Sequence, residues 1–265
     1  MKNILVPVGS HSNALNTLQY AIDFAEYMDA KIYLVHIFSS TKISGSFVNI
    51  DPILEKESRN IIKEHLSNVD KKNVEVDAKI LKGHTISSGI EKLTELLDID
   101  LVISSTNNDP SDNTIFLGKI IGSLVKDTNT PILLIPSKAQ FKPISKILMT
   151  IKSGKIEKES TLDALMTIKN RFNATVNLLQ VKTPNIKPDD LEINPTLSSI
   201  ISELILTNNA TVFQGVLEFL HEEAPDLICV IRRKRGFFKK LWEDDKVKKI
   251  DFDSNVPLLV LKGLS

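Results

Sequence analysis

The chain repeats its own pattern once along its 265 residues. Four stretches recur in the same order: KNILVPV at 2–8 as SKILMTI at 145–151, residues 16–37 as 160–181 without a gap, DIDLVIS at 98–104 as APDLICV at 224–230, and NTPILLIP at 129–136 as NVPLLVLK at 255–262. The offset between the copies falls from 144 positions (16 to 160) to 126 positions (98 to 224), so the second copy lacks about 18 residues. We expect two similar halves, with a shorter helix or loop between the second and third strands of the second half.

Short β-branched runs alternate with amphipathic stretches in the first half. These runs cover 3–7, 30–37, 74–81, 100–105 and 131–135. Runs such as ILLI and LVIS are apolar throughout, which is typical of parallel strands covered by helices on both faces of a sheet. Each half is therefore predicted to be an α/β unit with a five-stranded, doubly wound, mainly parallel sheet.

The segment between the two copies is polar and contains two prolines, Pro136 and Pro143. Such a composition is typical of a linker between packed units. We predict a first domain at 1–137, a linker at 138–144 and a second domain at 145–265.

The composition excludes several classes of protein. Thirty-three basic and thirty-three acidic residues cancel, so no net charge draws the chain to nucleic acid or to an anionic membrane surface. No run of about 18 apolar residues occurs, and the N-terminus turns polar too early for a signal peptide. The single cysteine, Cys229, lies in an apolar run and is assigned to strand packing in a reducing compartment. We expect a cytoplasmic protein that binds neither membrane nor nucleic acid.

A ligand site is expected beyond the carboxyl ends of the first and fourth strands, where the strand order of such a sheet reverses. The second of these loops leads to Gly118 and Lys119, just before an apolar helical run. A glycine there permits close approach of a phosphate to backbone N–H groups at a helix N-terminus. The alternative is that Gly118 only marks the place where a loop meets a helix and that Lys119 is solvated.

The strand sequences KNILVPV, AKIYLVHIF, DIDLVIS and NTPILLIP resemble those of the universal stress protein family, in both halves of the chain. The resemblance implies a tandem member with a Rossmann-like, adenine nucleotide alpha-hydrolase-like fold. One branch of that family binds adenosine nucleotides through a loop with the order Gly, two residues, Gly, nine residues, Gly, then Ser or Thr.

Counting back from Pro131 places the last glycine of that motif on Gly118 and the following Ser or Thr on Lys119. The two earlier glycines fall on Ser105 and Asn108, and the usual aspartate after the first strand is replaced by Gly9. Serine and asparagine could preserve part of the loop shape. These five residues are therefore predicted to form a vestigial nucleotide site.

The second half departs further from the motif. Its counterparts of Gly118 and Lys119 are Asp244 and Asp245, preceded by Glu243, and these carboxylates would repel phosphates. The counterparts of Ser105 and Asn108 are Ile231 and Lys234. We expect no nucleotide binding in this half.

Three other features have simple structural explanations. The basic and aromatic run 232–242 is followed at once by acidic residues, so a solvated loop is favoured over a nucleic-acid site. The five histidines are scattered without the spacing of a metal pair, and no metal site is assigned. Gly89 and Gly215 occupy equivalent positions in the third helix of each half, where close packing explains them.

The sequence and the resemblance together predict a non-enzymatic stress-response protein that acts by binding, with no catalytic residue and no resident cofactor. The alternative is a weak ATP-, ADP- or AMP-binding protein that uses the degenerate site of the first half. By resemblance, the two halves form an internal pseudo-dimer through their fifth strands. A homodimer and an unknown protein partner are both compatible with this hypothesis.

Overall fold

The computed structural model describes residues 1–11, 13–39, 50–83, 85–106, 115–184, 186–209, 212–232, 247–248 and 254–263. The strands of the first half are β1 (Asn3–Pro7), β2 (Lys31–Phe38), β3 (Val76–Lys82), β4 (Leu101–Ser105), β5 (Ile115–Leu117) and β6 (Ile132–Ile135). Its helices are α1 (Ala14–Met28), α2 (Asp51–Ser67), α3 (Ile86–Leu96) and α4 (Lys119–Asp127).

The second half repeats this order. Its strands are β7 (Lys146–Ile151), β8 (Thr175–Lys182), β9 (Glu203–Asn208), β10 (Leu227–Arg232), β11 (Val247–Lys248) and β12 (Leu258–Lys262). Its helices are α5 (Asp163–Phe172), α6 (Pro195–Ile200) and α7 (Val212–Glu223), with short 3-10 helices at Glu159–Leu162 and Pro188–Asp190.

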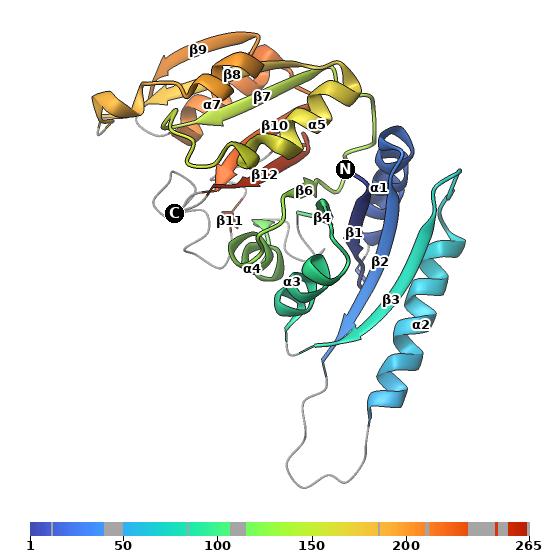
Figure 1. Ribbon diagram of the computed structural model, residues 1–265. Coiled ribbons are helices and arrows are strands. Elements are labelled where there is room, and N and C mark those ends of the chain that lie inside the picture. Colours follow the sequence, from blue (N-terminus) through green and yellow to red (C-terminus); the bar gives the residue numbers. More distant parts are fainter. Residues whose placement is uncertain are drawn as a thin grey trace, which may run out of the picture.

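Ten of these strands form one continuous sheet, in the order β3-β2-β1-β4-β6-β12-β10-β7-β8-β9 (Figure 1). The first five and the last five have the same order when each half is read from its outer edge, and the strands within each half are parallel. The predicted fold class is therefore confirmed. The fifth strands of the halves, β6 and β12, pair antiparallel, with Leu134 opposite Leu258, and this pairing joins the two five-stranded units.

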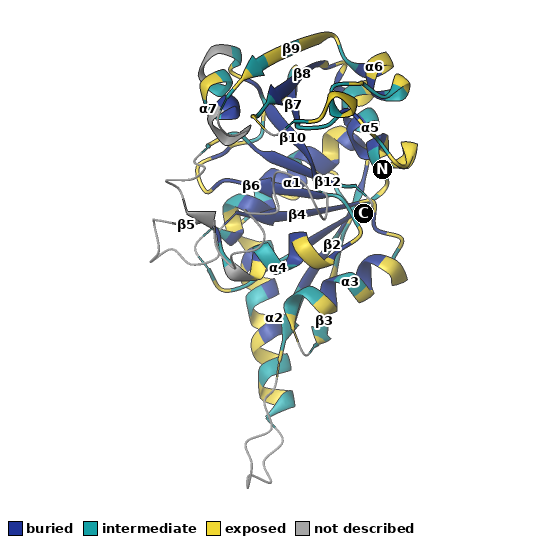
Figure 2. Ribbon diagram, turned by 90° about the vertical axis from the view of Figure 1, so that its left-hand side faces the viewer, coloured by how far each residue is buried: buried dark blue, intermediate teal, exposed yellow. Residues whose placement is uncertain are grey.

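Two apolar layers lie on the two faces of the sheet. Alternate residues of a strand enter different layers, as Ile4 and Val6 do on one face and Leu5 on the other. Helices α1, α2, α5 and α6 cover the first face, and α3, α4 and α7 cover the second. The buried strands run through the middle of both halves in Figure 2.

The missing residues of the second half shorten one helix. Helix α2 of the first half has 17 residues, whereas its counterpart α6 has six. The predicted shortening between the second and third strands is confirmed.

The third-helix glycines have the packing role expected of them. A Cβ on Gly89 would lie 3.0 Å from Ile37 of β2, and one on Gly215 would lie 2.9 Å from Val181, at the matching place on β8. Both helices therefore approach the second strand of their half too closely for a larger residue.

The segment between the halves is packed rather than free. Its Phe141 lies edge-on to Tyr20 of α1, with ring centroids 5.5 Å apart, and is tilted 6.2 Å from Phe172 of α5. Tyr27 and Phe172 stack directly across the two halves at 4.3 Å. Aromatic contacts thus join α1 and α5 over the central strands.

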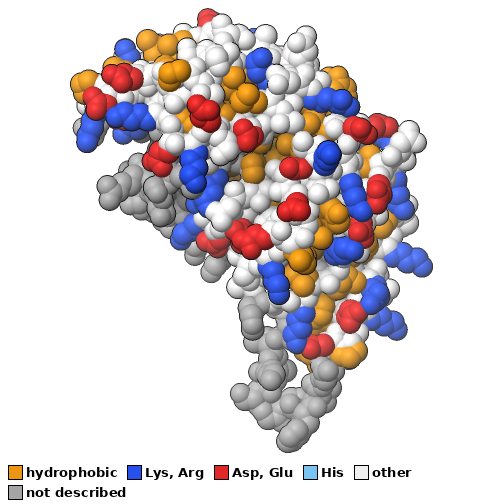
Figure 3. All heavy atoms as spheres, in the orientation of Figure 1, with side chains coloured by type: hydrophobic (Ala, Val, Ile, Leu, Met, Phe, Trp, Pro, Cys, Tyr) orange, Lys and Arg blue, Asp and Glu red, His pale blue; other side chains and the backbone are white. Residues whose placement is uncertain are grey.

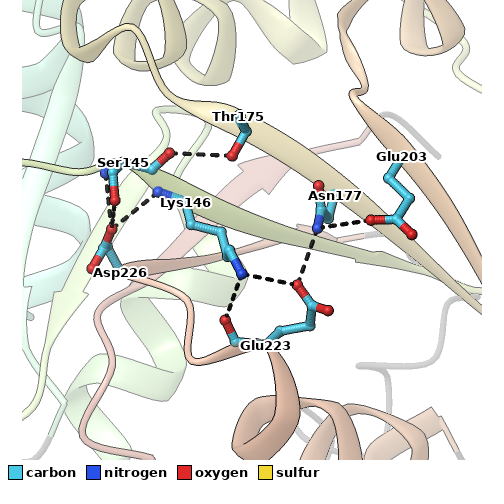
Figure 4. Close-up of polar contacts among 7 residues, drawn as sticks. All are labelled: Ser145, Lys146, Thr175, Asn177, Glu203, Glu223 and Asp226. Atoms are coloured by element: carbon cyan, nitrogen blue, oxygen red, sulfur yellow. Dashed lines mark hydrogen bonds and ion pairs between the residues drawn. The ribbon is translucent and has the colours of Figure 1, made fainter.

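In each half, an aspartate side chain accepts hydrogen bonds from backbone N–H groups at the start of the first strand. Asp226 accepts hydrogen bonds from the backbone N–H groups of Ser145 (2.8 Å) and Lys146 (3.0 Å) at the start of β7 (Figure 4). Asp100 accepts them from Lys2 (2.6 Å) and Asn3 (3.0 Å) at the start of β1. The repeated aspartate of the sequence motif is therefore a structural residue, far from the carboxyl ends of the strands.

The small antiparallel pair of β5 and β11 is not predicted by the sequence, because two or three residues are too short to show a period. It brings residues 247–248 of the second half beside the strand that precedes Gly118. The basic run 233–242 lies outside the described residues. Arg232, which precedes it, donates from a guanidinium nitrogen to Lys126 O at the end of α4 (2.6 Å).

Candidate ligand site

A cavity of about 280 Å³ lies at the carboxyl ends of β1 and β4, where the strand order of the first half reverses. Its polar lining comes from the loop after β1, the end of β2 and the end of β4. Its apolar lining comes mainly from isoleucines of α3 and α4. The lining residues are Pro7, Val8, Gly9, Ser10, His11, Val35, His36, Ile37, Ile86, Ile90, Ser104, Ile120, Ile121 and Leu124.

Of the five predicted site residues, some line this cavity and others do not. Gly9 lines it, whereas Ser105 is 3% exposed in β4 and its neighbour Ser104 faces the cavity instead. Asn108 lies outside the described residues. Lys119 is the first residue of α4, but its side chain is outside the described part.

Gly118 is the N-cap residue of α4, so the loop does meet the helix there. Its φ of −73° and ψ of 164° are extended angles that any residue can adopt. Its N–H, which a bound phosphate would require, donates instead to Thr106 O at 3.3 Å. The geometry at Gly118 therefore contains no conformational demand for glycine, and this N–H is engaged within the loop.

Three histidines gather around the loop after β1. His11 and His36 line the cavity, and His65 of α2 lies behind the loop with Nε2 3.0 Å from Gly9 O. A carbonyl only accepts, so neutral His65 must carry its proton on Nε2. The interpretation of the histidines as scattered was wrong for these three, because residues from three different elements meet here. Within the described ranges, no group of three side chains is arranged to hold a metal ion.

The imidazoles of His11 and His36 favour the neutral state. Burial lowers the pKa of His11, and the nearby His65 lowers it further. Burial also lowers the pKa of His36, opposed by Glu57 and reinforced by His65. The Nδ1 atoms of His11, His36 and His65 are buried and lack a hydrogen-bond partner among the described residues. The cavity thus presents neutral imidazole rings with unused hydrogen-bonding capacity.

We expect this cluster to make stability depend on pH. The pKa values of His11 and His36 in the folded chain are below the usual 6.5. As the pH falls through 6.5, these two residues therefore bind more protons in the unfolded chain than in the folded chain. The free energy of unfolding should therefore fall between pH 7.5 and about pH 5.5.

The variant His36→Gln tests this expectation, because Gln180 occupies the equivalent position of β8 and is only 1% exposed there. Urea unfolding at several pH values should show a shallower pH dependence in the variant than in the wild type. Equal slopes would contradict the assignment of the effect to His36.

The equivalent loop of the second half has a different neighbour. Gly154, in the loop after β7, donates its N–H to Asp190 O and accepts from Asn194 N, both at 3.0 Å. Gln180 Nε2 also donates to Asp190 O (2.7 Å). Residues 190–194 therefore lie against the loop where the first half has its cavity lining. The acidic residues 243–245 and Lys234 are outside the described part, and Ile231 is buried at the end of β10.

Comparison with known proteins agrees with this architecture. A model of the universal stress protein family matches residues 1–136, just over half of the chain. The chain belongs to the universal stress protein family. A known relative, Universal stress protein MJ0531 of Methanocaldococcus jannaschii, is 22% identical over 139 residues, which are 51% of this chain and 81% of that protein.

Solved structures of universal stress proteins also resemble the whole chain. One from Archaeoglobus fulgidus aligns with a TM-score of 0.73 and 14% identity, covering 98% of both chains. A protein of unknown function from Pseudomonas aeruginosa aligns with a TM-score of 0.59 and 12% identity, covering 99% of this chain and 93% of that one. At these identities the likeness establishes the fold. No helix within the described residues is long and apolar enough to cross a membrane.

The sequence interpretation missed the histidine cluster, and one signal could have revealed it. His11 follows the first strand and His36 lies near the end of the second, and these strands were predicted to be parallel. The carboxyl ends of parallel neighbours meet at one edge, so these two rings could have been placed together. His65 had no such signal, because its position depends on how α2 packs.

Proposed function

We propose that this universal stress protein acts in a stress response by binding, without catalysing a reaction, and that its first half holds a small ligand in the cavity beside His11 and His36. The observation that carries the proposal is the lining of that cavity. Among the described residues, it combines the imidazole rings of His11 and His36 with isoleucine side chains and includes no carboxylate, lysine or arginine. Few polar groups in an apolar cavity are typical of a binding site for small molecules.

The size and polarity of the cavity favour a compact, largely apolar ligand. Its volume of about 280 Å³ is slightly below the range of roughly 300 to 1,000 Å³ usual for drug-sized ligands. A neutral imidazole can accept one hydrogen bond and donate one. A ligand with a hydroxyl or N–H group can hydrogen-bond to an imidazole ring of His11 or His36, because both residues line the cavity.

The alternative proposal is weak binding of ATP, ADP or AMP in the same half, with the phosphates near Gly118 and Lys119. Gly9 stands where the family has an aspartate, and a lost charged hydrogen bond contributes about 1.5 to 3 kcal/mol, or roughly ten- to a hundredfold in affinity. We therefore expect a millimolar dissociation constant or no binding.

Calorimetric titration of the full chain with each nucleotide tests the alternative. Gly118→Val should abolish any residual binding, because it adds a β-branched side chain at the N-cap of α4. Gly122→Ala, one turn later in the same helix, is the matched control and should leave the affinity unchanged. Micromolar ATP binding that survives Gly118→Val would place the nucleotide elsewhere and overturn this assignment.

We further propose that 1–137 and 145–265 are the two domains, that 138–144 links them, and that they function as an internal pseudo-dimer. The match of the family model to 1–136 supports the first boundary. The pairing of β6 with β12 supports the internal pseudo-dimer. In this proposal the first domain binds the ligand. The second domain, in which residues 190–194 lie against the loop after β7, has a different role.

A further inference from the structure

Strand β9 forms the outer edge of the sheet in the second half, and one of its faces is uncovered. Leu204 is 43% exposed and Leu206 is 51% exposed, although both point to the face that α5 and α6 cover elsewhere. Figure 2 shows β9 as an exposed band at the margin of the molecule. Within the described residues, no strand pairs with the outer side of β9.

In the first half, the long helix α2 packs beside the equivalent edge strand, β3. Ala78 and Ile80 of β3 occupy the places equivalent to Leu204 and Leu206, and they line a groove with Ile62 and Leu66 of α2. In the second half the counterpart of α2 is the six-residue helix α6. The second half thus has two leucines where the first half has Ala78 and Ile80, and the neighbouring helix, α6, is shorter than α2.

The two edge strands also differ in their protection against pairing. Strand β3 carries Lys79 and Lys82, and charged side chains of this kind discourage edge-to-edge association. Strand β9 has the sequence ELILTN, without lysine, arginine or proline. Its only charge is Glu203 at one end.

We propose that β9 pairs antiparallel with β9 of a second copy of this chain, about a two-fold axis at Ile205. The backbone limits the register. Thr175 donates its N–H to Ser145 O, so the even-numbered residues of β8 face β9, and Asn209 accordingly donates to Lys182 O. Glu203, Ile205 and Thr207 therefore face β8, whereas Leu204 and Leu206 direct their N–H and C=O groups outward. With the axis at Ile205, Leu204 forms a hydrogen-bonded pair with Leu206 of the partner subunit, and Ile205 lies opposite itself in a non-hydrogen-bonded pair.

This register is self-complementary in its side chains. Residues directly opposite in an antiparallel pair share a face, so Leu204 lies opposite Leu206 of the partner subunit, and the reverse holds across the axis. Four leucines meet on one face, and no like charges are opposed. The equivalent pairing of β3 would set Lys79 against itself, which favours β9 as the contact between copies.

Sedimentation velocity of the full chain tests the proposal. A contact based on one six-residue strand is small, so we expect a reversible dimer with a dissociation constant on the order of 10 µM. Leu206→Lys should weaken it at least tenfold, because it sets a charge against Leu204 of the partner subunit. Leu96→Lys is the matched control, since Leu96 is a 70% exposed leucine on α3 of the first half, and the dimer should persist.

Cysteine cross-linking tests the register. Opposite residues in a hydrogen-bonded pair have Cα atoms about 5.5 Å apart, within disulfide range. A mixture of Leu204→Cys and Leu206→Cys chains should therefore cross-link on mild oxidation, whereas either variant alone should cross-link poorly. The native Cys229 is buried and does not compete.

Three outcomes would overturn the proposal. The wild type could stay monomeric up to roughly 200 µM, well above the expected dissociation constant. The dimer could survive Leu206→Lys, which would place the contact on another surface. The single-cysteine chains could cross-link as well as the mixture, which would exclude this register. None of these results bears on the ligand site of the first half.

Discussion

Replacing Gly154 with alanine is expected to lower the free energy of unfolding by about 2 to 4 kcal/mol. A Cβ at this position would overlap the backbone oxygen of Glu192 and lie 2.8 Å from Ile193 Cα. These are backbone atoms, so a change of rotamer cannot relieve the overlap. Residues 190–194 would have to move, and the two hydrogen bonds that Gly154 makes with Asp190 and Asn194 would weaken.

Urea unfolding measures this loss, and Gly9→Ala is the matched control from the loop after β1. Among the described residues, a Cβ on Gly9 would meet the ring of His11 alone, at an ordinary 3.4 Å. That change should alter stability by no more than about 0.5 kcal/mol. Equal effects of the two substitutions would contradict the close approach of residues 190–194 to the second loop.

The second large effect is expected from Asp226→Ala, with a loss of about 2 to 4 kcal/mol at pH 7. Besides the two backbone N–H groups, the Asp226 carboxylate accepts from Ser145 Oγ (2.6 Å) and pairs with Lys142 Nζ (2.6 Å). Figure 4 shows how it faces the start of β7. Removing it leaves donors of two adjacent residues without their acceptor.

Asp226 should also contribute to stability in acid. Burial by itself would raise its pKa, but the hydrogen bonds from Lys142, Ser145 and Lys146 outweigh it and lower the pKa to about 2. A folded pKa below the usual 3.8 means that the contribution is present above about pH 4 and is lost as pH falls toward 2.

Asp100→Ala provides the comparison, because Asp100 receives the same two backbone donors at β1. We expect a smaller loss there, about 1 to 2 kcal/mol. Urea unfolding of both variants and the wild type at pH 7 and pH 3 measures the difference. A larger effect of Asp100→Ala, or an Asp226→Ala deficit that does not shrink at pH 3, would contradict this account.

The two halves thus share a scaffold but differ at the carboxyl ends of their strands. Mixed charges cover the face shown in Figure 3, with basic and acidic side chains interspersed. The first half retains a cavity bordered by His11 and His36, while the second places residues 190–194 against its loop. We expect the halves to have separated in role, with ligand binding in the first and contact between copies in the second.

The sequence by itself determined the architecture of each half. The period of apolar residues distinguishes strands from helices, and the unbroken apolar runs of β4 and β6 indicate a sheet covered on both faces. The internal repeat predicted the shorter helix, and spacing from Pro131 placed Gly118 at a helix start, as found. These properties are local or repeated, so they can be read without knowing which distant segments meet. The nucleotide role of Gly118 stays a prediction.

The tertiary structure decided the rest. The meeting of His11, His36 and His65 depends on the packing of three elements, and the placement of residues 190–194 against Gly154 depends on the path of a loop. The exposure of Leu206 depends on a helix that is too short to cover it. The spacing of residues along the chain cannot reveal these contacts. Only the folded sheet brings residues that are far apart in the sequence together at one edge, and only the folded sheet leaves another edge without a neighbouring strand.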